Sequence, residues 1–153
     1  MLIILEGCDG AGKTTLAELL KNTIEDAQII HCNRETPNDM EFFKSIVLCS
    51  HNQTIIADRF CYGQFVYQEK EDRPLSYEDG VNTWDNPYGG LHKLETYILS
   101  QNIDVRLIYV YAEPDVIQKR LAMRNETVPV LNIMTKYAEL WTKSLLQPIY
   151  YKT

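Results

Sequence analysis

Residues 7–14 have the sequence GCDGAGKT, and they directly follow a short apolar run, Leu2 to Leu5, and Glu6. The stretch fills every fixed position of the pattern GxxxxGK[ST]. The apolar run is typical of a strand that is buried on both faces of a parallel sheet. Beyond the glycines, apolar residues recur at helical spacing, which predicts an amphipathic helix from residue 13 to about residue 24. They are Leu16, Leu19, Leu20 and Ile24. The resulting order of strand, glycine turn and helix is the context that this motif requires.

A glycine-rich turn in this context predicts phosphate binding. The glycines let the backbone curl so that its N–H groups converge on phosphate oxygens, and the helix N-terminus adds a favourable dipole. Lys13 is expected to reach the terminal phosphates of a nucleoside triphosphate, and the Thr14 hydroxyl is expected to bind Mg²⁺. The residues predicted to bind ATP are Gly7, Gly10, Ala11, Gly12, Lys13, Thr14 and Thr15.

The remaining apolar runs predict the rest of a sheet. Residues 28–31, 54–57 and 105–111 are further strand candidates, and the segments between them show helical periodicity. The tail PIYYKT, residues 148–153, could add a short edge strand. Such alternation predicts one α/β domain over residues 1–153, with a central parallel sheet of about five strands between layers of helices.

The C-terminal third predicts two helices. The segment 112–124, AEPDVIQKRLAMR, has proline and acidic residues that suit a first helical turn. Arg120 and Arg124 are four residues apart in it, so both cations are expected to point the same way. A last helix is expected over about 131–146, with core residues Met134, Tyr137, Leu140, Trp141 and Leu145. Residues 69–90 lack clear periodicity, and we expect them to form a functional loop on the substrate side.

Composition narrows the class of partner. The chain has 15 Lys and Arg against 21 Asp and Glu, for a net charge of -6, so long nucleic acid is disfavoured by repulsion. No apolar run reaches the roughly 18 to 20 residues that cross a bilayer, and a membrane is not expected as a partner. The cysteines Cys8, Cys32, Cys49 and Cys61 have no metal-binding spacing, and we interpret them as reduced thiols of a cytoplasmic protein.

Residues 55–60, IIADRF, at the end of a predicted strand, help to distinguish between the classes of phosphate-loop protein. The Asn-Lys-x-Asp motif typical of GTPases is absent, and Arg59 stands directly after Asp58, where an ATPase usually has a water-activating glutamate. An arginine there can bind the phosphate of an acceptor, which a glutamate would repel. Asp58 can meanwhile hold the water shell of the metal. The pattern therefore favours a kinase, with Lys13 and Arg59 as catalytic residues and Thr14 and Asp58 at the Mg²⁺.

Four segments together resemble the thymidylate kinases, a family of nucleoside monophosphate kinases with a P-loop fold. LEGCDGAGKTT resembles the first strand and phosphate loop of that family, and NRET, residues 33–36, is similar to its TREP segment. DRFCYGQFVYQ, residues 58–68, is similar to its DRY helix, and YAEPDVIQKRLAMR resembles the segment that carries its lid arginines. The short chain is similar to compact members such as viruses of bacteria encode. The resemblance implies a P-loop kinase fold, ATP as donor and Mg²⁺ as cofactor.

The resemblance also implies roles for single residues. Asp9 matches the loop aspartate that recognises the 3′-hydroxyl side of a deoxyribose acceptor. Arg34 and Arg59 match arginines near the acceptor phosphate, and Tyr67 and Gln68 match the pair that lines the nucleoside pocket.

Catalytic arginines for the transition state are expected from a lid at about residues 120–130. Gly10 stands where some family members carry a catalytic arginine in the loop, so Arg120 and Arg124 are the candidates.

The segment that holds thymine in the family is shortened here. Its base-holding phenylalanine and arginine have no clear counterparts. Phe42, Phe43 and Lys44 are possible substitutes, and Tyr62, Tyr67, Trp84 and Tyr88 are alternative surfaces for the base. The expected acceptor is thus a deoxynucleoside 5′-monophosphate, dTMP or a related pyrimidine, with weak discrimination among bases.

Two other functions stay open at the level of sequence. A deoxynucleoside kinase would phosphorylate a 5′-hydroxyl and need a base, for which Glu6 or Glu35 would have to serve. A nucleotide-binding regulatory module without turnover is a third possibility, against which the intact Lys13, Thr14 and Asp58 argue. The resemblance further implies a possible homodimer, formed here through the aromatic helix expected at residues 60–67.

Overall fold

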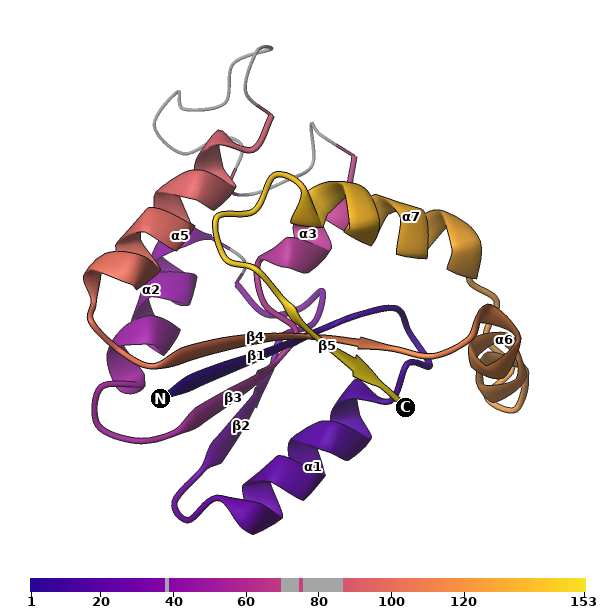
Figure 1. Cartoon of the computed structure of the whole chain (residues 1–153), viewed down its shortest axis with the longest axis horizontal. Helices are drawn as coiled ribbons and strands as arrows, with labels where there is room; N and C mark the ends of the chain where they lie inside the picture. The colour runs from indigo at the N-terminus through magenta and orange to yellow at the C-terminus, as the bar shows by residue number, and fades with distance from the viewer. Residues whose placement is uncertain (38, 70–74, 76–86) are drawn as a thin grey trace.

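The computed structural model describes residues 1–37, 39–69, 75 and 87–153. At its centre is a five-stranded sheet in which every neighbouring pair of strands is parallel (Figure 1). Across the sheet the order is β2 (Gln28–His31), β3 (Ile55–Asp58), β1 (Leu2–Glu6), β4 (Val105–Tyr111) and β5 (Ile149–Lys152). This confirms the predicted α/β class and the parallel sheet, including the edge strand in the C-terminal tail.

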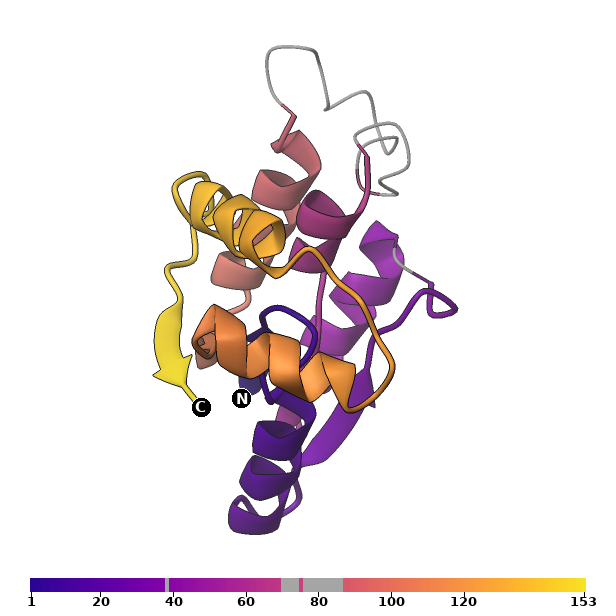
Figure 2. The same cartoon turned by 90° about the vertical axis from the view of Figure 1, so that its right-hand side faces the viewer.

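Helices cover both faces of the sheet. They are α1 (Lys13–Thr23), α2 (Met40–Cys49), α3 (Tyr62–Tyr67), α5 (Gly89–Ser100), α6 (Pro114–Ala122) and α7 (Val130–Trp141). Helix α1 lies on one side, α2, α3, α5 and α7 lie on the other, and α6 lies at the end of the sheet near the glycine loop (Figures 1 and 2). The result is the predicted three-layer arrangement.

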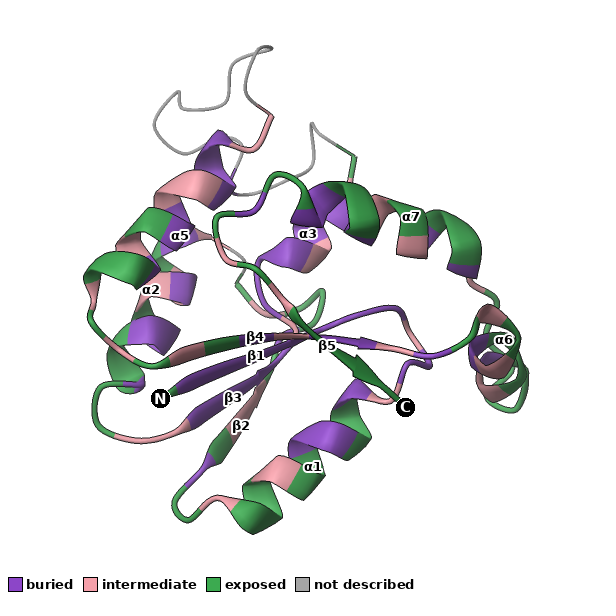
Figure 3. Cartoon of the chain, viewed as in Figure 1, coloured by how far each residue is buried: buried purple, intermediate pink, exposed green. Residues whose placement is uncertain are grey.

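The core follows the two central strands. Every residue of β1 and of β3 is buried, whereas all four residues of the edge strand β5 are exposed (Figure 3). A strand covered on both faces has no polar side, which is why β1 is apolar throughout until Glu6. Because β1 and β3 are parallel, their carboxyl ends lie at the same edge of the sheet, where the glycine loop begins.

Three expectations about helices are corrected. Helix α7 ends at Trp141, so Leu145 lies outside it and is 50% exposed, and its backbone N–H donates to the buried carboxylate of Glu95 at 2.8 Å. Leu19 of α1 is 57% exposed and does not belong to the buried face. Helix α6 ends at Ala122, so Arg124 follows the helix and does not share a ridge with Arg120.

The aromatic helix α3 is the element through which the resemblance implies a possible homodimer. Its residues Tyr62, Gln64, Phe65 and Val66 are buried within the chain, and α3 packs on α7. These side chains therefore make contacts within the chain, and the homodimer stays a prediction.

None of the four cysteines is in a disulfide, and Cys8, Cys32 and Cys61 are buried. Among the described residues, no helix has the length and apolar character needed to cross a bilayer.

Candidate active site

The glycine loop connects β1 to α1 with a backbone that residues other than glycine rarely adopt. Gly7 has φ 149°, and a Cβ built there would meet the Val110 carbonyl oxygen of β4 at 2.2 Å. Gly10 has φ 79°, and its Cβ would press on Ile117 and Leu121 of α6 at 3.2 to 3.3 Å. The loop is thus shaped by close contact with both β4 and α6.

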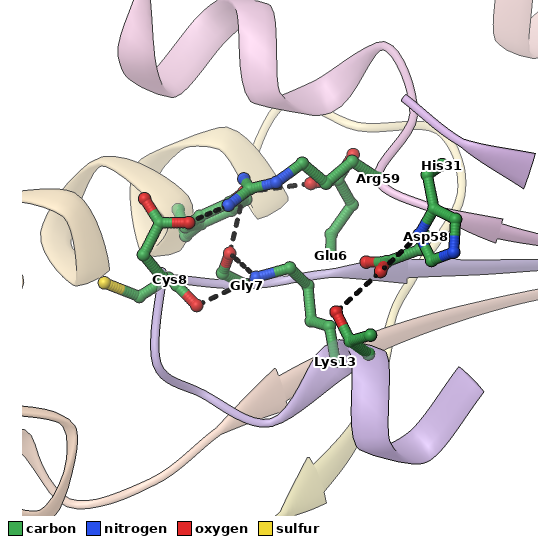
Figure 4. Close-up of polar contacts among 10 residues, drawn as sticks. Glu6, Gly7, Cys8, Lys13, His31, Asp58 and Arg59 are labelled. Carbon is green, nitrogen blue, oxygen red and sulfur yellow. Dashed lines mark hydrogen bonds and ion pairs between the residues drawn. The ribbon is translucent and has the colours of Figure 1, made fainter. Parts of the chain in front are cut away.

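Lys13 begins α1, and its ammonium turns back into the loop (Figure 4). The Nζ atom donates to the carbonyl oxygens of Gly7 at 2.8 Å and Cys8 at 2.9 Å. The residue is only 6% exposed. Burial, followed by the nearby Arg59 cation, lowers the pKa of Lys13 to about 8. The loop therefore holds a buried cation at the place where terminal phosphates were predicted to bind.

Thr14 and Asp58 come together as the sequence predicted for a magnesium site. The Thr14 hydroxyl donates to Asp58 Oδ2 at 2.8 Å, so hydroxyl and carboxylate oxygens converge between α1 and the end of β3. Hard oxygen ligands of this kind suit Mg²⁺, which usually takes few protein ligands beside phosphates and water. Among the described residues, no group of three or more His, Cys, Asp or Glu side chains could hold a metal ion. The pair thus fits a magnesium ion that is held jointly with phosphates.

His31 is a site residue that the sequence analysis missed. Its Nδ1 lies 3.0 Å from Asp58 Oδ2, because His31 and Asp58 are paired in the register of β2 and β3. The sequence offered one clue to this role. His31 is the last residue of a predicted strand, and Asp58 is close to the end of another. His31 contacts the carboxylate oxygen that also accepts the hydrogen bond from Thr14.

Arg59 turns into the site from a strained backbone. Its φ of 72° is left-handed, which is uncommon for a residue other than glycine. The guanidinium forms an ion pair with the Asp9 carboxylate and lies over the Tyr67 ring, 5.3 Å from its centre. Burial opposes the charge, but the oxygens of Tyr137, Tyr67 and Asp9 outweigh it and raise the pKa of Arg59. Arg59 therefore stays a cation at all accessible pH values.

Two pockets meet at Asp9 and Arg59. The first, of about 280 Å³, is the phosphate pocket, and it is lined by Asp9, Gly10, Gly12, Lys13, Thr14, Thr15, His31, Cys32, Asn33, Asp58, Arg59 and Arg124. The second, of about 590 Å³, is the acceptor pocket, and it is lined by Asp9, Cys32, Asn33, Arg34, Arg59, Phe60, Gly63, Gln64, Tyr67, Gln68 and Glu69. The acceptor pocket thus contains five of the six residues predicted to bind substrate.

The sixth, Tyr62, is corrected. It is fully buried, and its hydroxyl donates to Glu95 of α5 at 3.0 Å, while its ring contacts Trp141 of α7. It is not among the described residues that line the acceptor pocket. Both rings contact α7, Tyr62 at Trp141 and Tyr67 at Tyr137, but of the two only Tyr67 lines the acceptor pocket.

Most of the aromatic surfaces considered for a base pack elsewhere. Phe43 is fully buried against Phe60, with ring centres 4.6 Å apart, and Tyr88 stacks on Phe65 at 5.7 Å. Lys44 lies over the ring of Tyr97, and Phe42 packs against Phe43 at 5.5 Å. Trp84 and most of the predicted loop at 69–90 lie outside the described residues. Of the described candidates, Tyr67 lines the acceptor pocket.

The two arginines predicted for the lid separate. Arg120 Nη1 donates to the Gly10 carbonyl at 3.1 Å and to the Thr153 hydroxyl at 2.9 Å, so it ties α6 to the glycine loop and the C-terminal tail. Arg124 is exposed and lines both the phosphate pocket and a third pocket of about 420 Å³. The residues of that third pocket are Gly10, Gly12, Thr15, Leu16, Leu19, Arg120, Arg124, Tyr151 and Thr153. Arg124 is therefore better placed than Arg120 to reach a transferred phosphate.

The chain is similar in sequence to one curated protein from a prophage, and no family model matches it. It is 27% identical over 129 residues to the SPbeta prophage-derived uncharacterized protein YorR of Bacillus subtilis, covering 82% of this chain and 70% of that protein. The crystal structure of YorR in complex with phosphorylated GDP superimposes with a TM-score of 0.69 at 24% identity, over 99% of this chain and 85% of YorR.

Solved kinases share the same architecture. Polyphosphate kinase 2 from Arthrobacter aurescens gives a TM-score of 0.65 at 15% identity, over 99% of this chain and 60% of that one. The thymidylate kinase of Candida albicans gives a TM-score of 0.54 at 17% sequence identity, over 99% of this chain and 82% of that one. The deoxyadenosine kinase of M. mycoides with bound dCTP gives a TM-score of 0.54 at 14% sequence identity, over 100% of this chain and 89% of that one. Together with the parallel sheet and the glycine loop, these likenesses show that the chain has the fold of the P-loop nucleotide kinases.

Proposed function

We propose that this chain is a nucleoside monophosphate kinase that transfers the γ-phosphoryl group of ATP, with Mg²⁺, to a deoxynucleoside 5′-monophosphate. One observation carries the proposal: the phosphate pocket and the acceptor pocket meet at Arg59, a partly buried cation held between Asp9 and Tyr67. A kinase for monophosphates needs such a cation on the acceptor side, because two anionic phosphates must approach each other.

The residues around the phosphate pocket have separate tasks in the proposed transfer. The glycine loop and Lys13 bind the β- and γ-phosphates, and Thr14 and Asp58 hold the magnesium, which neutralises charge on the phosphate oxygens when it is bound. Arg59 and Arg34 bind the phosphate of the acceptor and place its oxygen opposite the γ-phosphorus. Arg124 stabilises the charge that spreads over the phosphoryl group in the transition state. Because a phosphate acceptor is already ionised, the reaction needs no side-chain base.

The third pocket is suited to the rest of the donor. It continues from the glycine loop along α1, with apolar contact from Leu16 and Leu19 and an aromatic ring from Tyr151. Its apolar and aromatic walls suit the base and sugar of ATP.

A deoxynucleoside kinase is the second candidate, and the M. mycoides deoxyadenosine kinase shares the fold. Its reaction would require a base near the acceptor hydroxyl. Glu6 is fully buried and accepts hydrogen bonds from Phe60 and Tyr137, so it is not available to take a proton from an acceptor. Glu35 is exposed and is not among the described residues of the acceptor pocket. These positions favour the monophosphate as acceptor.

The acceptor is proposed to be dTMP or a related pyrimidine deoxynucleotide. Tyr67 has a π-face that can stack on any base, and Gln64 and Gln68 line the same pocket, so discrimination among bases should be weak. The guanine nucleotide bound to YorR makes dGMP the main competitor to test.

The test is an ADP-release assay with ATP and Mg²⁺ over dTMP, dUMP, dCMP, dGMP and dAMP, with UMP as the ribose control and thymidine as the nucleoside control. We expect turnover with one or more deoxynucleoside monophosphates and a preference for dUMP over UMP. Activity on thymidine without activity on any monophosphate would assign the chain to the nucleoside kinases. Better activity on UMP than on dUMP would remove the proposed role of Asp9 in sugar selection.

A further inference from the structure

Glu6, the last residue of β1, is a buried carboxylate to which the proposed reaction assigns no task. It is 0% exposed, and its two oxygens have different partners. Oε1 accepts the backbone N–H of Phe60 at 2.8 Å, and Oε2 accepts the Tyr137 hydroxyl of α7 at 2.9 Å. Figure 4 shows the Glu6 side chain directed toward the segment that carries Arg59. The carboxylate therefore links the end of β1 to both the turn after β3 and helix α7.

The bond to Phe60 acts on the strained part of the site. A left-handed backbone at a residue such as Arg59 is unfavourable, and it persists only where surrounding contacts determine it. Two consecutive amides are held here by consecutive residues of β1: Arg59 N–H donates to the Leu5 carbonyl at 3.0 Å, and Phe60 N–H donates to Glu6. These bonds hold the turn that sends the Arg59 side chain into the acceptor pocket.

We infer that Glu6 is a positioning residue for phosphoryl transfer: its carboxylate fixes the left-handed turn at Arg59, and thereby the direction in which the guanidinium meets the acceptor phosphate. Tyr137 keeps the Glu6 side chain in place from the opposite side. The inference rests on the proposed function, because the task of Arg59 is the binding of an acceptor phosphate.

The charge of Arg59 and the hydrogen bonds from Phe60 and Tyr137 also stabilise the ionised form of Glu6. Burial raises the pKa of Glu6, and the Arg59 cation is the strongest influence against this rise, followed by the hydrogen bonds from Phe60 and Tyr137. A buried carboxylate stays in a protein only where such partners offset its desolvation. Glu6 thus supports Arg59 through the backbone and through its charge.

Glu95 offers a matched control within the same chain. It is also 0% exposed, and it accepts a tyrosine hydroxyl, that of Tyr62, as well as the backbone N–H of Leu145 at 2.8 Å. Glu95 is not among the described residues that line the three pockets. Glu95 also accepts the hydroxyl of Ser144 and, at 3.3 Å, the backbone N–H of Leu146. Substituting Glu95 therefore removes more hydrogen bonds than substituting Glu6, from a buried site outside the three pockets.

The experiment compares Glu6→Met, Glu6→Gln and Glu95→Met by steady-state kinetics and thermal unfolding. Methionine keeps the length of the side chain but leaves Phe60 N–H without an acceptor, whereas glutamine retains one amide oxygen for it. For Glu6→Met we expect the KM of the deoxynucleoside monophosphate to rise about tenfold or more while the KM of ATP changes less than about twofold. Glu6→Gln should stay within about threefold of the wild-type acceptor KM. Glu95→Met should lower Tm and leave both KM values unchanged.

An unchanged acceptor KM in Glu6→Met, or an equal rise in Glu95→Met, would overturn the positioning role. If Glu6→Met fails to fold, Tyr137→Phe is the variant to measure, because it removes the hydrogen bond to Glu6 Oε2 and keeps the aromatic ring. A rise of about threefold or more in the acceptor KM supports the inference, and a smaller change overturns it. A wild-type protein that phosphorylates no monophosphate would instead refute the proposed function, so the two failures are distinguishable.

Discussion

Arg59 is the residue on which the assignment of an acceptor depends. Its guanidinium is held between the Asp9 carboxylate and the Tyr67 ring, at the boundary of the phosphate and acceptor pockets. Lys13, by contrast, is proposed to bind the donor, and it contacts the loop carbonyls of Gly7 and Cys8. If the two cations bind two different phosphates, as proposed, substitutions at each should be separable in kinetics.

Arg59→Ala removes a cation that is proposed to bind only the acceptor. We expect the KM of the deoxynucleoside monophosphate to rise by about a hundredfold, because a charge-assisted contact to phosphate is lost, while the Kd of ATP changes little. Initial rates at varied acceptor concentration and calorimetric titration with ATP measure the two quantities. A Kd for ATP that rises as much as the acceptor KM would place Arg59 on the donor side.

Lys13→Met should lower kcat by several orders of magnitude, because charge stabilisation dominates such transfers.

The same variant tests the lowered pKa of Lys13, which is about 8. The folded protein binds this proton more weakly than the unfolded chain, so between pH 8 and about pH 10.5 the unfolded state holds more protons and stability rises with pH. Relative to Lys13→Met, the wild type should gain unfolding free energy over that window. A difference that is constant with pH in urea unfolding would contradict the lowered pKa.

At the scale of elements, the loop between β1 and α1 was predictable and the contacts around it were only partly so. GCDGAGKT specifies its own geometry, because its glycines and the helix that follows are neighbours in sequence. The contact of His31 with Asp58 depends on the register of β2 against β3, and that of Glu6 with Tyr137 spans 131 positions. Pairings of this kind are set by packing of the whole sheet, which a local pattern does not encode.

Helix α6 shows the same limit. Its apolar positions Ile117 and Leu121 were placed correctly on the inner face, where they press on Gly10. Its end was not, because the last helical residue is Ala122 and not Arg124. Both arginines still line the third pocket, but of the two only Arg124 is among the described residues that also line the phosphate pocket. The end of a helix is the part that periodicity predicts least well.

The different contacts of Arg120 and Arg124 give a prediction for the lid. Arg124→Ala should lower kcat about tenfold or more with little change in the KM of either substrate, since its contact is expected in the transition state. Arg120→Ala should chiefly lower Tm and raise the KM of ATP, because Arg120 ties α6 and Thr153 to the loop carbonyl of Gly10. The two single variants, compared by kinetics and thermal unfolding, are controls for each other. Equal losses of kcat in both variants would support the expectation from the sequence that Arg120 and Arg124 act together in catalysis.

At the scale of the whole molecule, the parallel sheet brings both phosphate sites to one edge. The glycine loop follows β1, the Asp-Arg pair ends and follows β3, and His31 ends β2, so donor and acceptor groups converge at the carboxyl ends of neighbouring strands (Figure 4). YorR and the solved kinases share the fold of this chain. Because the fold is common to all of them, the proposed substrate has to be decided by the acceptor pocket.

The most direct measurement is the identity of the product formed from γ-labelled ATP, Mg²⁺ and an equimolar mixture of deoxynucleosides and their 5′-monophosphates, resolved by mass spectrometry. We predict labelled deoxynucleoside diphosphates, with the dTMP product among them, and no product from the Lys13→Met variant under the same conditions. Labelled monophosphates formed from the nucleosides alone, or no labelled nucleotide beyond that of the Lys13→Met variant, would contradict the assignment of this chain as a nucleoside monophosphate kinase.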